Sequence, residues 1–201
     1  MSKASSSSRN IDFLFEMGNI RHLPRMWSRF GGIPFANLAE HHFHVFWIAM
    51  VIAAHEKNVD TGKIAKLVMV HDIAESRSGD VDYLARQYVE RNEELSIKDM
   101  LVDTAVEAEF LALWKEYEIR KSLESQIVKD ADNLNVDFEL IEQAANGIDL
   151  KDRWSHRAKI ADSKLYTATA KAIYQQLQGA NPHAWHMNGR NRVNDGDWKQ
   201  Q

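Results

Sequence analysis

The sequence predicts an all-α fold, a helical bundle, and three observations support this prediction. Apolar residues recur at a spacing near 3.6 along most of the chain, and no segment shows the alternation typical of a half-buried strand. The three prolines of the chain fall between the apolar stretches, where helix breakers belong. A length of 201 residues suits one domain with a single substantial core.

The apolar spacing predicts seven helices. They cover about residues 10–17, 38–57, 61–76, 81–91, 96–119, 122–146 and 161–178. The longest irregular connection inside the core spans residues 21–36, and a loop of this length often carries function. We expect one domain over 1–201, with its core at about 10–178 and an irregular tail over 179–201.

The helix predicted over 38–57 presents a histidine on its core face. Asn37 followed by Glu40 resembles a capping box, which places the helix start and puts His41 in the first turn. The apolar stripe that contains His41 continues through Val45, Ile48 and Ile52. His41 therefore points into the bundle, where a lone histidine is either a satisfied core residue or a ligand.

Two further segments offer metal-ligating side chains. His71 and Asp72 form a mixed nitrogen and oxygen pair suited to a divalent ion, although the dipeptide alone is common by chance. Asp132 shares a face with Val128 and Val136, where a carboxylate is costly unless it is paired or bound to metal. Asp130 aligns instead with polar residues, so Asp132 is the predicted ligand. Three helices could thus bring four ligands to one point in the core.

Composition limits which metal ligands and which partners the chain can have. The chain has no cysteine, so a metal site must use histidine and carboxylate. A formal net charge of -4 gives no general basic field, and we expect no nucleic-acid polymer as a partner. No stretch approaches eighteen uninterrupted apolar residues and the serine-rich start has no apolar core, so we expect a cytoplasmic protein without a membrane partner.

Several blocks of the chain, taken in order, resemble the HD-domain phosphohydrolases, whose ligand pattern is H…HD…D, and more closely their 5'-deoxynucleotidase branch. The blocks that carry this resemblance are Pro24-Arg25-Met26-Trp27, Ala39-Glu40-His41, Val70 to Glu75, Gly79-Asp80-Val81, Leu113 to Glu118 and Lys129-Asp130-Ala131-Asp132. They run from about Ile11 to about Glu142. The chain departs from its relatives after Asp80, where it lacks the proline found there.

The resemblance implies a metal-dependent reaction and assigns its central residues. One divalent ion, whether Mn, Co, Mg, Zn or Fe, would be bound by His41, His71, Asp72 and Asp132. Asp72 and Glu75 would be the catalytic carboxylates, with Glu75 orienting the attacking water or moving a proton. The alternative for Glu75 is an ordinary surface residue one helical turn after His71.

The resemblance also implies a nucleotide site. Arg25 would bind the phosphate, Trp27 would contact the nucleoside, and Asp80 would face the sugar and favour deoxyribose. The alternatives are a solvated Arg25, a Trp27 that only packs the loop, and an Asp80 that caps a helix starting near Val81. Because spacing in this loop varies among relatives, Arg29 also stays open as the phosphate ligand.

The implied activity is hydrolysis of deoxyribonucleoside 5'-monophosphates by a homodimeric enzyme. One alternative is a related hydrolase that acts on nucleoside triphosphates or another phosphorylated metabolite. A second is a noncatalytic nucleotide-binding regulatory module, which would have no use for Glu75.

Overall fold

A computed structural model describes residues 6–31, 35–152, 154 and 156–188. The described chain is a stack of helices without a strand, apart from an isolated bridge between Pro24 and Asn37. Its elements are α1 (Ser6–Asn19), η1 (Ile20–His22), α2 (Ser28–Gly31), α3 (Leu38–His55), α4 (Thr61–Val70), α5 (Glu75–Ser78), η2 (Ala85–Gln87), α6 (Glu93–Leu101), α7 (Glu107–Ile119), α8 (Leu123–Ala145), α9 (His156–Lys164), α10 (Ala168–Leu177) and α11 (Ala184–Met187). The predicted all-α fold is confirmed.

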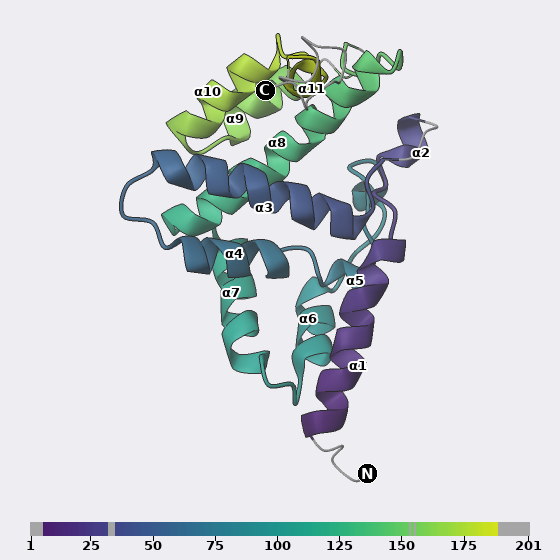
Figure 1. Ribbon diagram of the computed structural model, residues 1–201. Coiled ribbons are helices and arrows are strands. Elements are labelled where there is room, and N and C mark those ends of the chain that lie inside the picture. The colour runs from purple at the N-terminus through teal and green to yellow at the C-terminus, as the bar shows by residue number, and fades with distance from the viewer. Residues whose placement is uncertain (1–5, 32–34, 153, 155, 189–201) are drawn as a thin grey trace, which may run out of the picture.

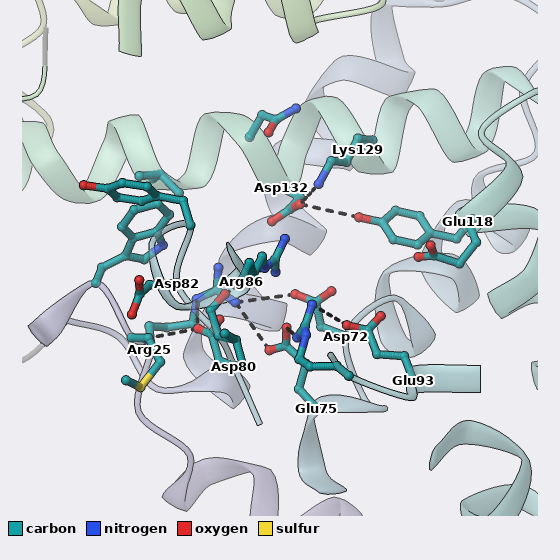
Figure 2. A pocket seen from close by; sticks show the side chains of 18 of the residues that line it. Arg25, Asp72, Glu75, Asp80, Asp82, Arg86, Glu93, Glu118, Lys129 and Asp132 are labelled. Atoms are coloured by element: carbon teal, nitrogen blue, oxygen red, sulfur yellow. Dashed lines mark hydrogen bonds and ion pairs between the residues drawn. The ribbon is translucent and has the colours of Figure 1, made fainter. Parts of the chain in front are cut away.

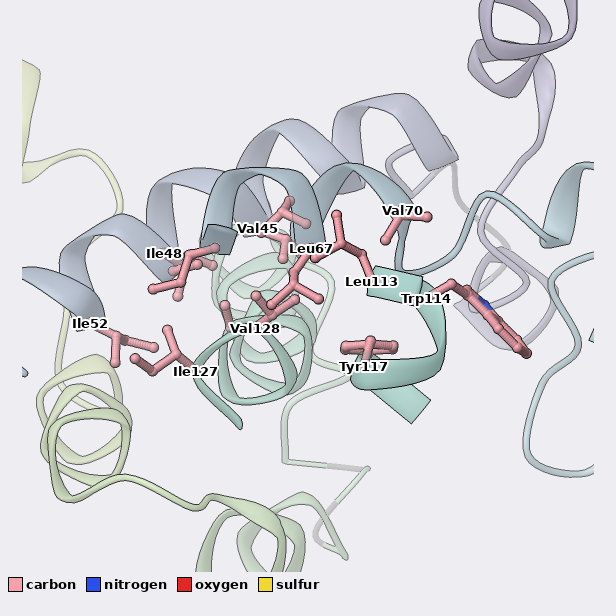
Figure 3. Close-up of a cluster of buried hydrophobic side chains, with 14 of the residues drawn as sticks. Val45, Ile48, Ile52, Leu67, Val70, Leu113, Trp114, Tyr117, Ile127 and Val128 are labelled. Carbon is pink, nitrogen blue, oxygen red and sulfur yellow. The ribbon is translucent and has the colours of Figure 1, made fainter. Parts of the chain in front are cut away.

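Two long helices, α3 and α8, form the centre of the molecule (Figure 1). Helix α4 packs against both, α7 lies below them in the view, and α9 and α10 cover the other side of α8. The apolar stripe of α3 meets apolar side chains of α4, α7 and α8 in one core (Figure 3). Among its residues, Val45, Ile52, Leu67, Ile127 and Val128 have no exposed surface. Burial of this apolar surface is what holds the helices in register around the site.

The start of α3 follows the sequence prediction. The side chain of Asn37 accepts a hydrogen bond from the backbone N–H of Glu40, and the carboxylate of Glu40 accepts one from the backbone N–H of Asn37. This reciprocal capping box satisfies two N–H groups that the helix itself cannot pair. His41 consequently enters the core in the first turn of α3 and is fully buried.

Four predicted helices differ from the structure. The helix expected over 96–119 is two helices, α6 and α7, because Asp103 adopts a left-handed backbone (φ 61°) between them. The stretch 81–91 holds only the short η2 turn, since the Asp82 side chain accepts hydrogen bonds from the N–H groups of Leu84 and Ala85. Such local bonds compete with a helix.

The other two differences bear on the site. The helix expected over 61–76 ends as α4 at Val70, and tighter bonds such as Glu75 N–H to the Asp72 carbonyl carry the chain into α5. The stretch 161–178 is divided between α9 and α10 at Thr167, which caps α10. In the expected tail, α11 lies within 179–188, and the remainder, 189–201, lies outside the described residues, as does Pro34.

Within the described residues, no helix combines the length and the apolar character needed to cross a membrane.

Candidate metal and phosphate site

Four predicted ligands converge at the junction of α3, α4 and α8. One ligand atom each from His41, His71, Asp72 and Asp132 lies within 4.8 Å of all the others. The Nε2 atom of His41 is 3.4 Å from Asp132 Oδ1 and 3.6 Å from Asp72 Oδ2. Both histidines are buried, at 0% and 2% exposure, so the cluster lies on the core side of the helices.

The two imidazoles are oriented by partners on their outer nitrogens. His41 Nδ1 lies 2.7 Å from the side-chain oxygen of Asn135, and His71 Nδ1 lies 2.7 Å from the carbonyl oxygen of Val68. Because an oxygen of this kind can only accept, both Nδ1 atoms carry protons. The two Nε2 atoms then face each other at 3.2 Å inside the cluster, where a neutral ring presents its lone pair.

This arrangement fits a divalent cation. Two facing imidazole lone pairs have no proton between them unless one ring is charged, and a cation is the natural partner for both. The outward Nδ1 bonds are the kind that fix metal-ligating histidines. Two nitrogens and two carboxylates form a mixed set that suits several divalent ions, and thiolate plays no part in it.

The charges inside the cluster are strongly coupled. Burial opposes ionisation of Asp72 and Asp132, but His71 beside Asp72 and Lys129 beside Asp132 hold the pKa of both carboxyls below the usual range. Burial also opposes a charged His41, yet hydrogen bonds to Asp132 and Asp72 raise its pKa to about 9. The same burial lowers the pKa of His71. In the protein alone a proton on His41 partly balances the two carboxylates, and a bound cation would replace that proton.

Arg25 is buried against the acidic side of the cluster and is therefore not a solvated residue. Its guanidinium lies 3.4 Å from Asp72, 3.9 Å from Glu75 and 3.5 Å from Asp80, and the residue is 7% exposed. Figure 2 shows these carboxylates gathered around it. Arg29 instead binds Asp82 at 2.9 Å with half of its side chain exposed. Of the two arginines, Arg25 lies beside the cluster and lines the cavity, whereas Arg29 does not line it.

Glu75 is a buried carboxyl with unusual proton affinity. Burial, reinforced by the charges of Asp72 and Asp80, raises its pKa to about 9 against the opposing charges of Arg25 and Arg91. A group in this state is a neutral acid at pH 7 and can donate a proton. Its 4% exposure excludes the alternative of an ordinary surface glutamate.

Asp80 fastens the Arg25 loop instead of capping a helix. Gly79 ends α5 with a positive φ of 78°, the conformation that glycine adopts without strain, and turns the chain toward the site. The Oδ2 atom of Asp80 then accepts a hydrogen bond from the backbone N–H of Met26 at 3.1 Å. The capping role expected of Asp80 as an alternative belongs to Asp82.

A cavity of about 320 Å³ opens over these residues. It lies at the lower end of the range for small-molecule sites. Its lining includes Arg25, Trp27, Asp72, Glu75, Asp80 and Asp132 together with Arg86, Arg91, Arg120 and Lys129. The predicted catalytic and substrate residues thus share one space with two of the predicted metal ligands.

Sequence reasoning missed several residues of this site. Asn135 orients His41 and is itself held by His44, whose Nδ1 lies 2.9 Å from the Asn135 amide nitrogen. Arg91, at the end of the helix expected over 81–91, contacts Glu75. Asn135 had one available signal, its place one turn after Asp132 on the inner face of α8. No sequence signal pointed to Arg91, because Arg91 lies in a loop, where helical spacing does not predict which side chains face the site.

The expectation for Asp130 was wrong, and two further side chains lie against the cluster. Asp130 lies on a buried side of α8, not a solvated one, and its carboxylate accepts hydrogen bonds from Tyr166 and Thr167. His42 is buried with its ring centroid 4.6 Å from that of His71. Lys129 donates a hydrogen bond to Asp132 at 2.7 Å.

The comparison with known families decides the identity of the fold. A profile of the HD domain matches residues 17–179, most of the chain. The chain belongs to the HD domain family. The four clustered residues fall within the matched range, in the order H…HD…D that the sequence predicted.

Individual HD-domain relatives agree with this assignment. The chain is 29% identical over 149 residues to the human protein named 5'-deoxynucleotidase HDDC2, an alignment that covers 71% of this chain and 70% of the relative. It is 30% identical over 150 residues to the Dictyostelium discoideum protein of the same name, covering 68% and 76%. The structure of a predicted metal-dependent phosphohydrolase from Magnetospirillum magnetotacticum MS-1 superposes with a TM-score of 0.70 at 22% identity, covering 87% and 94%, and supports the fold alone.

Proposed function

We propose that this chain is a metal-dependent 5'-deoxynucleotidase, which hydrolyses deoxyribonucleoside 5'-monophosphates to deoxynucleoside and phosphate. The observation that carries the proposal is the buried His41, His71, Asp72 and Asp132 cluster beside the cavity that also contains Arg25 and Glu75. The names of the human and Dictyostelium relatives support the substrate class.

The four clustered residues would hold one divalent cation. When bound, such an ion polarises phosphate oxygens and lowers the pKa of a coordinated water. Mn, Co, Mg, Zn and Fe all accept this donor set, so the native ion is to be found by assay. The chain's own residues must then place the phosphate, supply a proton and seat the nucleoside.

Arg25 would bind the phosphate. Its contacts to Asp72, Glu75 and Asp80 are 3.4 to 3.9 Å long, whereas strong charge-assisted bonds measure about 2.7 to 2.9 Å. The guanidinium is therefore anchored in place without being saturated. A phosphate oxygen arriving beside it gains shorter bonds than these carboxylates supply.

Glu75 would assist proton transfer. Hydrolysis forms a bond from a water oxygen to phosphorus and breaks the bond from phosphorus to the 5'-oxygen, which must then gain a proton. Glu75 carries a proton at neutral pH and lines the cavity next to Arg25. A pure binding module has no use for such a group, which favours an enzyme over the regulatory alternative.

Trp27 and Asp80 would seat the nucleoside. Trp27 lines the cavity and is partly exposed while its ring packs on neighbouring aromatic residues, so it combines a packing role with an accessible face. The contacts of Asp80 with Met26 and Arg25 use its Oδ2 atom. The other oxygen, Oδ1, would accept a hydrogen bond from the 3'-hydroxyl of the sugar. In that position the carboxylate would crowd the 2' position and so disfavour a ribose 2'-hydroxyl.

A longer phosphate chain is the second candidate substrate. Besides Arg25, the cavity is lined by Arg86, Arg91, Arg120 and Lys129, more cations than one phosphate requires. This observation favours a nucleoside triphosphate or another phosphorylated metabolite. The modest cavity volume favours the monophosphate.

A homodimer and a cytoplasmic location complete the proposal. Phe43, Trp47 and Val51 follow one another at helical spacing on α3 and are 68%, 54% and 51% exposed, which supports a covered apolar face. Light scattering should give a dimer mass for the wild type and a monomer mass for Trp47→Glu. Fractionation of cells that express the tagged chain tests the compartment.

The assay that tests the activity measures phosphate release from matched deoxyribo- and ribonucleoside mono- and triphosphates, with each metal added to chelated protein. We expect the deoxyribonucleoside monophosphates to give the highest kcat/KM. A preference for triphosphates would contradict the monophosphatase assignment and favour the second candidate, a hydrolase of nucleoside triphosphates. Asp132→Ala serves as the inactive control.

A further inference from the structure

The two loops at the mouth of the cavity are joined to each other. The Arg25 loop and the segment after Asp80 are connected by the Arg29 to Asp82 ion pair at 2.9 Å and by the hydrogen bond from Met26 N–H to Asp80 at 3.1 Å. Asp82 lies on the opposite side of the cavity from Glu118 (Figure 2). A side chain on either loop is therefore held at a defined position relative to the other.

Tyr83 is the aromatic residue that this connection fixes in place. Its ring stacks on Phe30 with centroids 5.4 Å apart at 27°, and it lies 6.2 Å from Trp27. Asp82 holds the backbone on the other side by accepting hydrogen bonds from the N–H groups of Leu84 and Ala85. Tyr83 nevertheless keeps 54% of its surface exposed and lines the cavity. An aromatic ring fixed on its neighbours and open toward a cavity is a preformed stacking surface.

The cavity wall combines ionic side chains with flat aromatic ones. Near the metal cluster the lining is ionic, with Arg25, Asp72, Glu75 and Asp132. The flat apolar surfaces lie on the two joined loops, at Trp27 and Tyr83. A ligand that satisfies both ends carries an anionic group at one end and a planar ring at the other, as a nucleoside monophosphate does.

We propose that Tyr83 is a substrate-binding residue that stacks on the nucleobase and forms, with Trp27, the base subsite of the enzyme. This inference rests on the proposed nucleotide substrate. Every base has an aromatic face, so stacking here strengthens binding of all of them and does not select among them.

The test compares substrates with and without a base. We measure kcat/KM of wild type, Tyr83→Ala and Tyr83→Phe for deoxynucleoside 5'-monophosphates of all four bases and for 2-deoxyribose 5-phosphate. Tyr83→Ala should lose about 5- to 100-fold on every nucleotide, the range for one lost base stack, and should leave 2-deoxyribose 5-phosphate unchanged. Tyr83→Phe should retain wild-type values. Tyr88→Ala is the matched control, because Tyr88 is 81% exposed and outside the cavity lining.

Other outcomes separate this inference from the proposed activity. An equal loss on both kinds of substrate, or no loss on either, would overturn the role of Tyr83 while the activity stands. If the wild type releases no phosphate from any nucleotide, the proposed activity fails, and titration calorimetry with the same ligands then decides the subsite. Tyr83→Ala should weaken binding of the nucleotide alone; equal binding by wild type and variant, or no binding at all, would contradict the inference.

Discussion

Arg91 donates a hydrogen bond to Glu75 at 3.2 Å and a second to the carbonyl oxygen of Gly79 at 3.0 Å. One guanidinium thus ties the proposed proton-transfer group to the turn that carries Asp80. Arg91 also pairs with Glu93, and its side chain is 13% exposed. Glu75 is consequently positioned from two sides, by Arg91 and by Arg25, and its orientation does not depend on a bound substrate.

Replacing Glu75 with glutamine should separate chemistry from binding. Glutamine keeps an oxygen for Arg91 but cannot deliver a proton, so kcat should fall about 10²- to 10⁴-fold while bound metal and nucleotide affinity stay near wild type. Steady-state kinetics and metal analysis of the purified variant check this. A rise in KM alone would make Glu75 a positioning residue.

Substitutions of Arg25 and Asp80 should differ in their effect on the preference for deoxy over ribo substrates. Arg25→Ala should weaken every phosphorylated substrate alike, because a phosphate contact ignores base and sugar. Asp80→Ala should lose activity preferentially on deoxy substrates and narrow the deoxy-to-ribo ratio of kcat/KM. The ratio is measured for matched monophosphates, and an unchanged ratio in Asp80→Ala would remove the sugar contact from the proposal.

Asp130 should be essential for stability and dispensable for metal binding. Its buried carboxylate accepts bonds from the N–H groups of Tyr166 and Thr167 and from the Thr167 hydroxyl, at 2.7 to 2.8 Å. Asp130→Ala leaves these donors unpaired, and we expect a loss of about 3 kcal/mol of unfolding free energy. Urea unfolding gives this value, with the exposed Glu90→Ala as control. A variant as stable as wild type, or one that is folded but cannot bind metal, would refute this assignment.

Glu139 should make the protein less stable as the pH rises. Its carboxylate is 7% exposed and unpaired among the described residues, and burial raises its pKa to about 7 despite the charges of His41 and Arg25. Because the folded state binds this proton more tightly than the unfolded state, the stabilisation is present below the ordinary pKa of 4.5 and is lost as the pH rises through about 7.

Glu139→Gln removes this dependence. The variant should be more stable than wild type by about 1 to 3 kcal/mol at pH 8, with a smaller difference at pH 5. Urea unfolding at both pH values measures the difference, and Glu90→Gln controls for a surface charge. Parallel pH profiles for Glu139→Gln and wild type would show that Glu139 titrates normally.

Helical periodicity placed two members of the metal cluster, His41 and Asp132, whereas His71 and Asp72 were predicted from their ligand chemistry and from the family pattern. His41 follows a capping box and continues an apolar stripe, and Asp132 lies between Val128 and Val136 on the inner face of α8. The same reasoning failed for Asp130, because α9 and α10 bury a second face of α8. Periodicity identifies one buried face, whereas a central helix has more than one.

Loops and helix ends were less predictable. The stretch 96–119 has continuous helical spacing, yet Asp103 adopts a left-handed backbone and divides it. Asp82 caps the start of another expected helix by accepting hydrogen bonds from the N–H groups of Leu84 and Ala85, but only the short η2 turn follows. These breaks depend on single residues, as does the approach of Arg91 to Glu75.

That residues 1–201 form one domain stays a prediction.

The most direct test of the central claim is to measure bound metal and turnover together. Chelated wild-type protein should be inactive on a deoxyribonucleoside monophosphate, and activity should rise with added divalent ion and saturate near one ion per chain. Asp72→Ala and Asp132→Ala should each lose bound metal and turnover in parallel, by orders of magnitude, because each removes an anionic ligand. Full activity in the chelated wild type, or full metal occupancy and turnover in either variant, would contradict the assignment of His41, His71, Asp72 and Asp132 as the catalytic metal site.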